Sequence, residues 1–570
     1  MKKILLLLLN TCLLVRLEGQ ICTSPQSAVD ITGKNVQARI LNGGDLFTDF
    51  NNGQFLPDPV AGGGNPSTIF AAGLWVGGVD PGGNLKLAAA TYRNPGGNDF
   101  WAGPLDQNGM TDPVSCSNWD KLFRVTRTRI EAFRQQLPLF QNDPAAAIAQ
   151  YPDIMGWPAY GNPFFAQVWG FDLPNQSLAP YDGLDNDAFY NPLKGDFPAV
   201  RLQGKPAFVP EEIIWCVFND QGAGAMHSNS NGKPVQIEVQ LTAWTFNCTQ
   251  TSALDRTVFT SHKIINRALE RLDSTFVGLW ADVEIGCGVD DYAGCQPGLN
   301  CYFAYNADAL DGSPTTNCFD DTPTFEINPP VQTVTFLNTS LDKFMVYNAS
   351  NVGSVPPATA DPSQPNQYYN YLTGRFRDGT PLTGYGSGYN PGDPASPAGN
   401  FAFPGDPAAV SAWTMCTANV PIGDRRVLGA HQFGSLAPGA SCELTAAWTA
   451  HLNDQLPCNL GNTFAEVEAL HTAYANGFNG PCAIVATQTP EQPGFILTPN
   501  PASDAVRVQY GDLEVRAIHL LGADGRLLRR WQQPGTAETS LDLSGLTAGV
   551  YTVQVFTDQR SLARKVCVAR

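Results

Sequence analysis

The sequence predicts a mainly β fold, with a large β-sandwich-like body that contains two short helices. Three observations support this class. The 570 residues include 55 glycines and 44 prolines, which favour turns. Only 15% are charged while 10% are aromatic, whereas long helices or disorder would need more charge. Several short apolar segments also alternate with polar residues at the two-residue period of a β-strand.

The clearest strand candidates lie between residues 210 and 350. In the segment 235–241, valine, isoleucine and leucine alternate with Gln236, Glu238 and Gln240, so one face is predicted to enter a core. Upstream, the segments 36–41 and 69–76 are apolar strand candidates broken by glycine-rich turns. The other predicted strands of the main body are residues 213–218, 257–265 and 276–285.

Two segments show helical periodicity instead. Residues 117–135 carry apolar side chains at steps of three and four, with Ser117 as a plausible N-cap and a break near Thr126. Thr463 and Glu466 have the spacing of a capping box, which predicts a helix that continues through Tyr474.

Residues 355–410 are rich in proline, glycine and aromatic residues and are predicted to form a long structured loop. The aromatic side chains either pack this loop against the sandwich or line a carbohydrate platform, because aromatic rings stack on sugar faces. Packing is the preferred interpretation. The aromatic residues concerned are Tyr368, Tyr369, Tyr371, Phe376, Tyr385, Tyr389, Phe401 and Phe403.

The first residues resemble a signal peptide. Lys2 and Lys3 precede an apolar core that is too short to span a bilayer, and cleavage is expected near Gln20. A lipoprotein signal acylated at Cys12 or Cys22 is the alternative, although neither follows a good lipobox. No later segment reaches the ~18 apolar residues of a membrane helix. We therefore expect a soluble mature chain without a membrane span.

Charge is distributed unevenly along the chain. The whole sequence carries −18, residues 21–490 carry −21, and residues 491–570 carry +1. An acidic body of this kind will not seek nucleic acid or anionic lipid. Its acidic residues either aid solubility, which we prefer, or bind divalent cations. The predicted organisation is a signal peptide (1–20), an N-terminal β-rich region with a short helix (21–200), the main sandwich with long aromatic, Gly/Pro-rich loops (201–486), a linker (487–494) and a terminal domain (495–570).

The terminal domain carries several short motifs in a fixed order. Residues 499–504 read PNPASD, residues 524–526 read DGR, and residues 549–551 read GVY before a basic and apolar last strand. This pattern resembles the type A C-terminal sorting domain of type IX secretion cargo in Bacteroidota. The residues that carry the match, and hence the predicted sorting signal, are Pro499, Asn500, Pro501, Asp504, Gly525, Gly549 and Tyr551.

The resemblance implies an Ig-like β-sandwich that the outer-membrane type IX secretion machinery recognises. It also implies a secreted or cell-surface location, and possible partners in surface lipopolysaccharide or glycans. The body resembles a recurring class of large Bacteroidota cargo proteins with no assigned activity. Among the matching segments are Cys116–Trp119, Trp157–Gly161, Gly195–Pro198 and Trp280–Gly286.

Two acidic sets are candidates for calcium, which takes six to eight oxygen ligands. Asp182, Asp185 and Asp187 lie within six residues, but the spacing is not that of a complete EF-hand. In the second set, Asp282 and Glu284 share one face of a strand and the following loop brings Asp290 and Asp291 back towards them. A carboxylate pair for glycoside hydrolysis is conceivable here. Further oxygens could come from Asn300, Asn306, Asp308 and Asp311.

The cysteines fit an exported chain, which can keep disulfides. Cys287, Cys295, Cys301 and Cys318 cluster in one loop-rich stretch and are predicted to be bridged, with a connectivity that the sequence leaves open. There is no HExxH zinc motif and no GxSxG nucleophile elbow. We therefore expect an exported structural or adhesive protein, with calcium as the one candidate cofactor and no catalytic residue assigned. A secreted hydrolase or glycan-binding protein is the alternative.

Overall fold

The computed structural model describes residues 22–569 with internal gaps, and it divides the chain into two compact units, Met1–Ala486 and Thr487–Arg570. The predicted signal peptide and the predicted linker 487–494 lie outside the described residues. The mainly β class is confirmed, with 38% strand and 16% helix. The gaps are residues 60–63, 94–96, 184–187, 223–225, 249–252, 313–317, 319–322, 351–354, 394–397, 453, 455, 479–494, 511–512, 523–526, 533–536 and 558–560.

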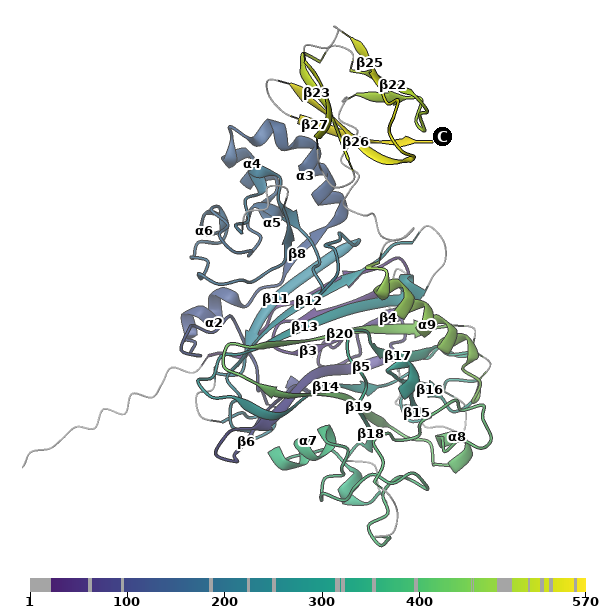
Figure 1. Ribbon diagram of the computed structural model, residues 1–570. Helices are drawn as coiled ribbons and strands as arrows, with labels where there is room; N and C mark the ends of the chain where they lie inside the picture. Colours follow the sequence, from purple (N-terminus) through teal and green to yellow (C-terminus); the bar gives the residue numbers. More distant parts are fainter. Residues whose placement is uncertain are drawn as a thin grey trace, which may run out of the picture. The chain divides into compact units, whose positions relative to one another are not determined.

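The first unit contains two nine-stranded sheets, both antiparallel (Figure 1). In the first sheet the order is β1-β2-β3-β5-β14-β19-β18, with β4 beside β2 and β6 beside β5. Its strands are β1 (Ala28–Thr32), β2 (Val36–Leu41), β3 (Asp45–Leu46), β4 (Phe55–Pro57), β5 (Ile69–Val79), β6 (Leu85–Ala89), β14 (Leu272–Val283), β18 (Lys343–Asn348) and β19 (Arg425–Leu436).

The second sheet runs β15-β16-β17-β20-β13-β12-β11-β7, with β8 beside β11. Two further short strands, β9 (Tyr181–Asp182) and β10 (Phe197–Pro198), pair with each other. The strands of the second sheet are β7 (Trp101–Ala102), β8 (Phe123–Thr126), β11 (Glu212–Asn219), β12 (Ile237–Thr245), β13 (Thr257–Asn266), β15 (Asp291–Gln296), β16 (Cys301–Asn306), β17 (Val331–Phe336) and β20 (Ser441–His451).

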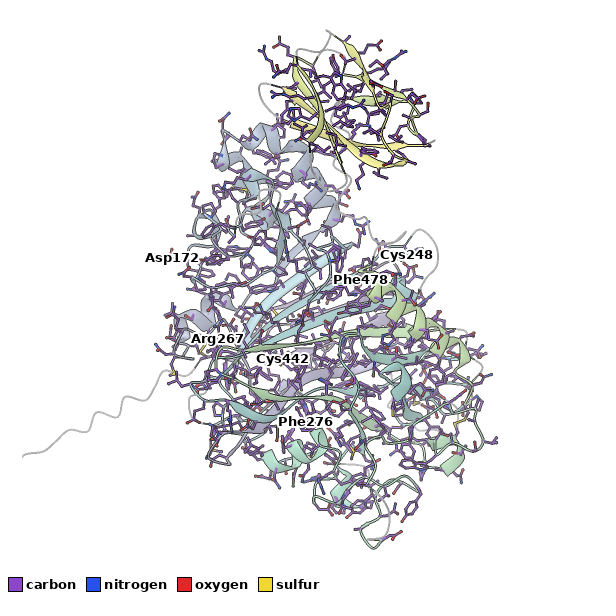
Figure 2. The ribbon with its side chains drawn as sticks, in the orientation of Figure 1. Asp172, Cys248, Arg267, Phe276, Cys442 and Phe478 are labelled. Atoms are coloured by element: carbon purple, nitrogen blue, oxygen red, sulfur yellow. A yellow bond between two sulfur atoms is a disulfide. The ribbon has the colours of Figure 1, made fainter. Side chains whose placement is uncertain are left out.

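Apolar side chains from both sheets form one buried cluster, and side chains fill this interior (Figure 2). Val239 and Leu241 of β12 enter this cluster with Val277 and Leu279 of β14, as the alternation along 235–241 predicts. Burying each such side chain contributes about 1.5–3 kcal/mol. The predicted boundary between residues 21–200 and 201–486 is not a boundary between compact units. Both sheets combine strands from before and after residue 200.

The helical segment 117–135 differs from the prediction. A strand, β8, interrupts it between α2 (Pro113–Trp119) and α3 (Arg127–Phe140), because residues 123–126 pair with β11. Asp112 caps α2 in place of Ser117, and Thr126 caps α3. These helices join a second apolar cluster on the outer face of the second sheet, with α4 (Pro144–Gln150), α5 (Pro152–Met155) and α6 (Phe165–Trp169). Cys248 and Phe478 belong to the same cluster (Figure 2).

The segment predicted as a long loop contains a helix, α7 (Pro365–Leu372), which contacts β5, β6, β14, β18 and β19 of the first sheet. Tyr368, Tyr371, Phe376 and Phe403 are buried, so packing is what holds these aromatic residues. Tyr385 is the exposed exception, at 42%. The other elements of this unit are α8 (Met415–Ala418), η1 (Pro192–Lys194), η2 (Ala253–Arg256), η3 (Pro297–Leu299) and η4 (Pro357–Thr359).

The predicted helix near Thr463 exists as α9 (Gly461–Ala475), but the capping box does not form. Asp454 satisfies the start of the helix instead. The carboxylate of Asp454 accepts hydrogen bonds from the backbone N–H of Asn462 (3.0 Å) and Thr463 (3.4 Å). Glu466 instead accepts a hydrogen bond from His451 on β20, at 2.6 Å. The sequence pattern therefore located the helix but not the residue that caps it.

The second unit is a small sandwich of two antiparallel sheets, which fits the Ig-like expectation. One sheet is β21-β22-β25 and the other is β24-β23-β26-β27, with an apolar core that draws on both. The strands are β21 (Ile496–Thr498), β22 (Ala505–Gln509), β23 (Val515–Leu521), β24 (Leu527–Gln532), β25 (Glu538–Asp542), β26 (Gly549–Thr557) and β27 (Ser561–Val568).

One core residue of the first unit yields a stability prediction. His262 on β13 is fully buried, and neither ring nitrogen has a hydrogen-bond partner among the described residues. Burial lowers its pKa to about 3. Because the unfolded chain then binds the extra proton between about pH 6.5 and pH 3, this histidine makes stability fall as pH falls through that window.

We expect His262→Leu to be neutral or to stabilise the body by up to about 1–3 kcal/mol, since it removes an unsatisfied polar ring. The variant should also lose less stability than the parent between pH 6.5 and pH 4. Urea denaturation across that range measures both quantities. A loss of stability together with an unchanged pH slope would contradict this description of the core.

Candidate functional site

The end of strand β14 gathers acidic side chains from distant parts of the chain. Asp282 and Glu284 lie two residues apart and therefore project from the same face of the sheet. Asp282 is 1% exposed and lies directly opposite Arg426 of the neighbouring strand β19. The register of two adjacent strands thus places a carboxylate beside a guanidinium.

Asp282 is held by two partners. One guanidinium nitrogen of Arg426 lies 2.9 Å from Oδ1 of Asp282, and the hydroxyl of Tyr92 donates to Oδ2. Arg426 also donates to the Tyr92 hydroxyl at 2.9 Å and pairs with Asp424. Both carboxylate oxygens of Asp282 are therefore in contact with a cation or a hydrogen-bond donor.

Glu284 is less well compensated. Burial, with a further contribution from the charge of Asp282, raises the pKa of Glu284 to about 8, although Arg426 acts in the opposite direction. Burial also raises the pKa of Asp282 to about 6, again against the influence of Arg426. Burial therefore favours the protonated form of Glu284, which can donate a hydrogen bond.

These side chains border a cleft of about 830 Å³ on the outer face of the first sheet. Its rim is polar, because loops between β3 and β5 contribute amide and hydroxyl groups. The lining residues include Asn51, Asn52, Gln54, Asn65, Ser67, Phe70, Tyr92, Asp282, Glu284, Asp424 and Arg426.

A second acidic group lies where the loop after β14 leads into β15. Asp291 and Asp290 are buried, as is Asp311, and a carboxylate oxygen of Asp290 lies within 4.8 Å of one from Asp311. Asp311 accepts hydrogen bonds from the backbone N–H of Cys287 (2.8 Å) and of Phe325. Asp291 accepts one from Ile285 at 3.0 Å, and its Oδ1 has no hydrogen-bond partner among the described residues. We call Asp290, Asp291 and Asp311 the acidic pocket.

The acidic pocket has little positive charge near it. No lysine, arginine or histidine in the part of the chain that the structure describes pairs with any of its three carboxylates. The charge of Asp291 acts to raise the pKa of Arg425. The guanidinium of Arg425, however, donates its hydrogen bonds to Asn348 and to the carbonyl of Pro421. Burial therefore raises all three pKa values: that of Asp311 to about 6, and that of Asp291 well above its usual range.

The four carboxylates predicted as one calcium set thus divide between two neighbouring places. Asp282 and Glu284 line the cleft, where Arg426 already supplies a cation. Asp290 lies beside Asp311, and Asp291 is close enough to both that their charges help to raise its pKa. Of the other predicted set, Asp182 is on β9, 3.4 Å from Arg201, while Asp185 and Asp187 lie outside the described residues.

The prediction that four cysteines are bridged is right for Cys287 and Cys318 and wrong for Cys295 and Cys301. Cys287 and Cys318 are bonded, but Cys295 and Cys301 are free and buried. Cys295 lies opposite Tyr302 in the β15–β16 ladder, and Cys301 is the residue before Tyr302. The two cysteines therefore point to opposite faces of the sheet and cannot meet. Further bonds join Cys22 to Cys116 and Cys416 to Cys458.

One arrangement has the spacing of a nucleophile, a base and an orienting acid. The hydroxyl of Thr333 lies 2.9 Å from Nε2 of His451, whose Nδ1 lies 2.6 Å from Glu466. Such relays activate hydroxyl nucleophiles only where substrate can reach them. Thr333 is 0% exposed and His451 is 1% exposed, so the relay ties α9 to the sheet and offers no reactive hydroxyl.

In the second unit, the predicted sorting residues meet at the last strand. The side chain of Asn500 accepts a hydrogen bond from the backbone N–H of Cys567 (2.8 Å) and donates to the carbonyl of Lys565 (2.9 Å). Gly549 begins β26, and the Tyr551 hydroxyl donates to the carbonyl of Thr547 at 2.8 Å. Pro499, Pro501 and Asp504 flank Asn500 in the same loop, and Gly525 lies outside the described residues.

Residues 497–569 match the family described as the secretion system C-terminal sorting domain. The chain therefore ends in a type IX secretion sorting domain and is an exported cargo protein, with a secreted or cell-surface location. The sorting domain also makes the secretion machinery a partner of this chain. Among the described residues, no helix has the length and apolar character needed to cross a membrane.

The other comparisons add little about the body. No curated protein matches the chain significantly. Among solved structures, a polysaccharide lyase matches with 8% identity and a TM-score of 0.17, over 66% of this chain and 37% of the lyase chain. At this TM-score the likeness supports no inference about fold or activity.

The Asp282–Arg426 pair gives a prediction for the cleft. Arg426→Gln leaves a buried carboxylate without its cation and should cost about 3–5 kcal/mol of stability. Adding Asp282→Asn removes that charge, so the double variant should be more stable than Arg426→Gln alone. Urea denaturation of the parent, both single variants and the double variant measures the coupling. Additive effects would show that the pair does not interact as described.

The sorting domain gives a second prediction. Deletion of residues 495–570 should leave the protein in the periplasm, because the outer-membrane machinery then lacks its recognition domain. Cell fractionation and surface proteolysis locate the protein, with the full-length chain as the control. Normal surface display of the truncated chain would refute the assignment.

Proposed function

We propose that the body acts outside the cell as a structural or adhesive protein whose fold calcium stabilises, and that the acidic pocket holds the ion. The observation that carries this proposal is the set of three buried carboxylates with raised pKa values and no paired cation among the described residues. A buried charge is stable only when it is paired, protonated or bound to a metal. A secreted protein meets calcium, which prefers such oxygen ligands.

The proposed ligands are Asp290, Asp291 and Asp311. Asp291 Oδ1 lacks a hydrogen-bond partner among the described residues, and carboxylate oxygens of Asp290 and Asp311 lie within 4.8 Å of one another. Cys287 lies beside them, but its sulfur is bonded to Cys318 and cannot act as a thiolate ligand. Water molecules would supply the remaining oxygens that calcium requires.

The rival function, glycoside hydrolysis, is less well supported by the cleft. Glu284 has the raised pKa of a general acid, and carboxylate oxygens of Asp282 and Glu284 lie within 4.8 Å. Hydrolysis requires the two carboxyl groups to flank the scissile bond. Here both groups project from the same face of one strand, and Tyr92 and Arg426 occupy the oxygens of Asp282.

Calcium binding predicts a stability effect that depends on pH. Since the pKa values in the acidic pocket are raised, the folded state holds more protons than the unfolded state above about pH 4. Stability without calcium should therefore fall as pH rises through about 6, the pKa of Asp311. Calcium at 100 times its Kd would restore about 2.7 kcal/mol.

The measurement is the melting temperature of the secreted protein with calcium and with EGTA, at pH 8 and at pH 4.5. Calcium should raise it at pH 8 and have less effect at pH 4.5, because the raised pKa values favour the protonated carboxyls at low pH. In Asp291→Asn the calcium effect at pH 8 should be lost, whereas Asp182→Asn should retain it. Equal melting temperatures with calcium and with EGTA at pH 8 would sink the proposal.

A further inference from the structure

A cleft on the outer face of the second sheet belongs to neither acidic site. It has a volume of about 560 Å³ and lies over β11, β12, β13 and β20, which run side by side (Figure 1). Residues 177–181 form one wall, and Tyr160 and Arg201 border the cleft. The helices of the second apolar cluster cover other parts of this sheet face, so the cleft occupies the part that they leave open.

The floor of the cleft is polar, which is unusual for the covered face of a sheet. Thr242, Ser261 and Thr445 lie opposite one another on three adjacent strands and form one row. Gln240, Lys263 and Glu443 form a second row across the same strands. Cross-strand partners share a face, so both rows project towards the space above the sheet. The lining of the cleft includes every member of these rows except Thr445.

Two groups on this floor lack partners. Lys263 lies opposite Glu443, but among the residues that the structure describes its ammonium forms no ion pair or hydrogen bond. Glu443 instead accepts a hydrogen bond from Ser261 at 2.6 Å. The hydroxyl of Thr242 also has no hydrogen-bond partner within the described ranges. The cleft therefore offers one cation and one hydroxyl to a ligand.

One aromatic ring lies at the rim of the cleft, and a second ring outside the lining packs against it. Tyr160 lines the cleft and stacks on Phe189, with ring centroids 5.3 Å apart and an angle of 22° between the planes. Phe189 is 51% exposed, whereas most large apolar side chains of the body are buried. An exposed ring beside a polar floor suits a ligand that has both an apolar ring face and hydroxyl groups.

We propose that this cleft binds an acidic saccharide, with the anionic group on Lys263, ring hydroxyls on Thr242 and a sugar face against the Tyr160–Phe189 pair. The shared chemistry is a hydroxylated ring that carries a carboxylate or a sulfate. The proposal is independent of calcium binding, because the acidic pocket lies at the start of β15 and in the loops beside it, whereas the cleft lies over β11, β12, β13 and β20. It gives the body an adhesive target that the sorting domain does not specify.

The test is isothermal titration calorimetry of the full secreted chain with three trisaccharides in saturating calcium. These are trigalacturonate, a sulfated galactotriose and neutral galactotriose. At least one acidic trisaccharide should bind more tightly than the neutral one. Lys263→Met should weaken that acidic ligand about tenfold or more, since a hydrogen bond to a charged group is lost, and should leave the neutral one unchanged. Phe189→Ala should weaken all the trisaccharides that bind.

Lys86→Met is the matched control, because Lys86 is also half-buried on a strand but belongs to β6 of the first sheet. It should change no affinity by more than about twofold, and each variant should melt with the parent. Tighter binding of the sulfated sugar than of trigalacturonate would support the proposal and identify sulfate as the anionic group. Equal binding of acidic and neutral sugars, an unchanged affinity in Lys263→Met, or no binding of any trisaccharide at millimolar concentration would overturn it.

Discussion

The end of strand β14 brings more carboxylates into the interior than the cations beside it can neutralise. Asp282 forms an ion pair there, because the register of β14 and β19 places Arg426 opposite it. The hydroxyl of Tyr92 donates a hydrogen bond to its second carboxylate oxygen. Glu284 and the acidic pocket have no such partner, and burial raises their pKa values instead. An ion pair beside uncompensated carboxylates is the physical feature on which our account of the body depends.

The two acidic places differ in the positive charge beside them. In the cleft, the guanidinium of Arg426 pairs with Asp282 and Asp424, so the protein itself supplies the cation for these two carboxylates. In the acidic pocket, backbone N–H groups satisfy some oxygens but contribute no full charge. We propose that a divalent cation compensates these carboxylates in the exported protein. The sorting domain determines the location, and the body responds to that location through its chemistry.

Much of the fold was predictable because strand periodicity is a local property. The alternation along 235–241 gave the core face of β12 correctly. The burial of the polar face of β12 was not predictable. Glu238, on that face, is buried by residues distant in sequence and pairs with Arg267 at 3.1 Å. The strand β8 was hidden inside a helical pattern, since pairing with β11 overrode the local preference. The free thiols of Cys295 and Cys301 likewise follow from strand register, which cysteine spacing does not reveal.

The candidate site shows the same limit. The sequence identified Asp282, Glu284, Asp290 and Asp291 from their proximity, but Arg426 and Tyr92 come from other strands and loops and were not foreseen. Asp311 was only one of several possible oxygen donors until the structure placed it beside Asp290. The cleft over β11, β12, β13 and β20 had no sequence signal, because its floor residues come from four strands that are separated in sequence, with one or two residues from each.

A crystal structure of the secreted protein grown with calcium at pH 8 tests the central claim most directly. Our account predicts an anomalous peak in the acidic pocket, with carboxylate oxygens of Asp290, Asp291 and Asp311 at the 2.3–2.6 Å typical of calcium. An empty pocket in such crystals, with the carboxyls hydrogen-bonded to one another, would show that protonation and not a metal ion stabilises them.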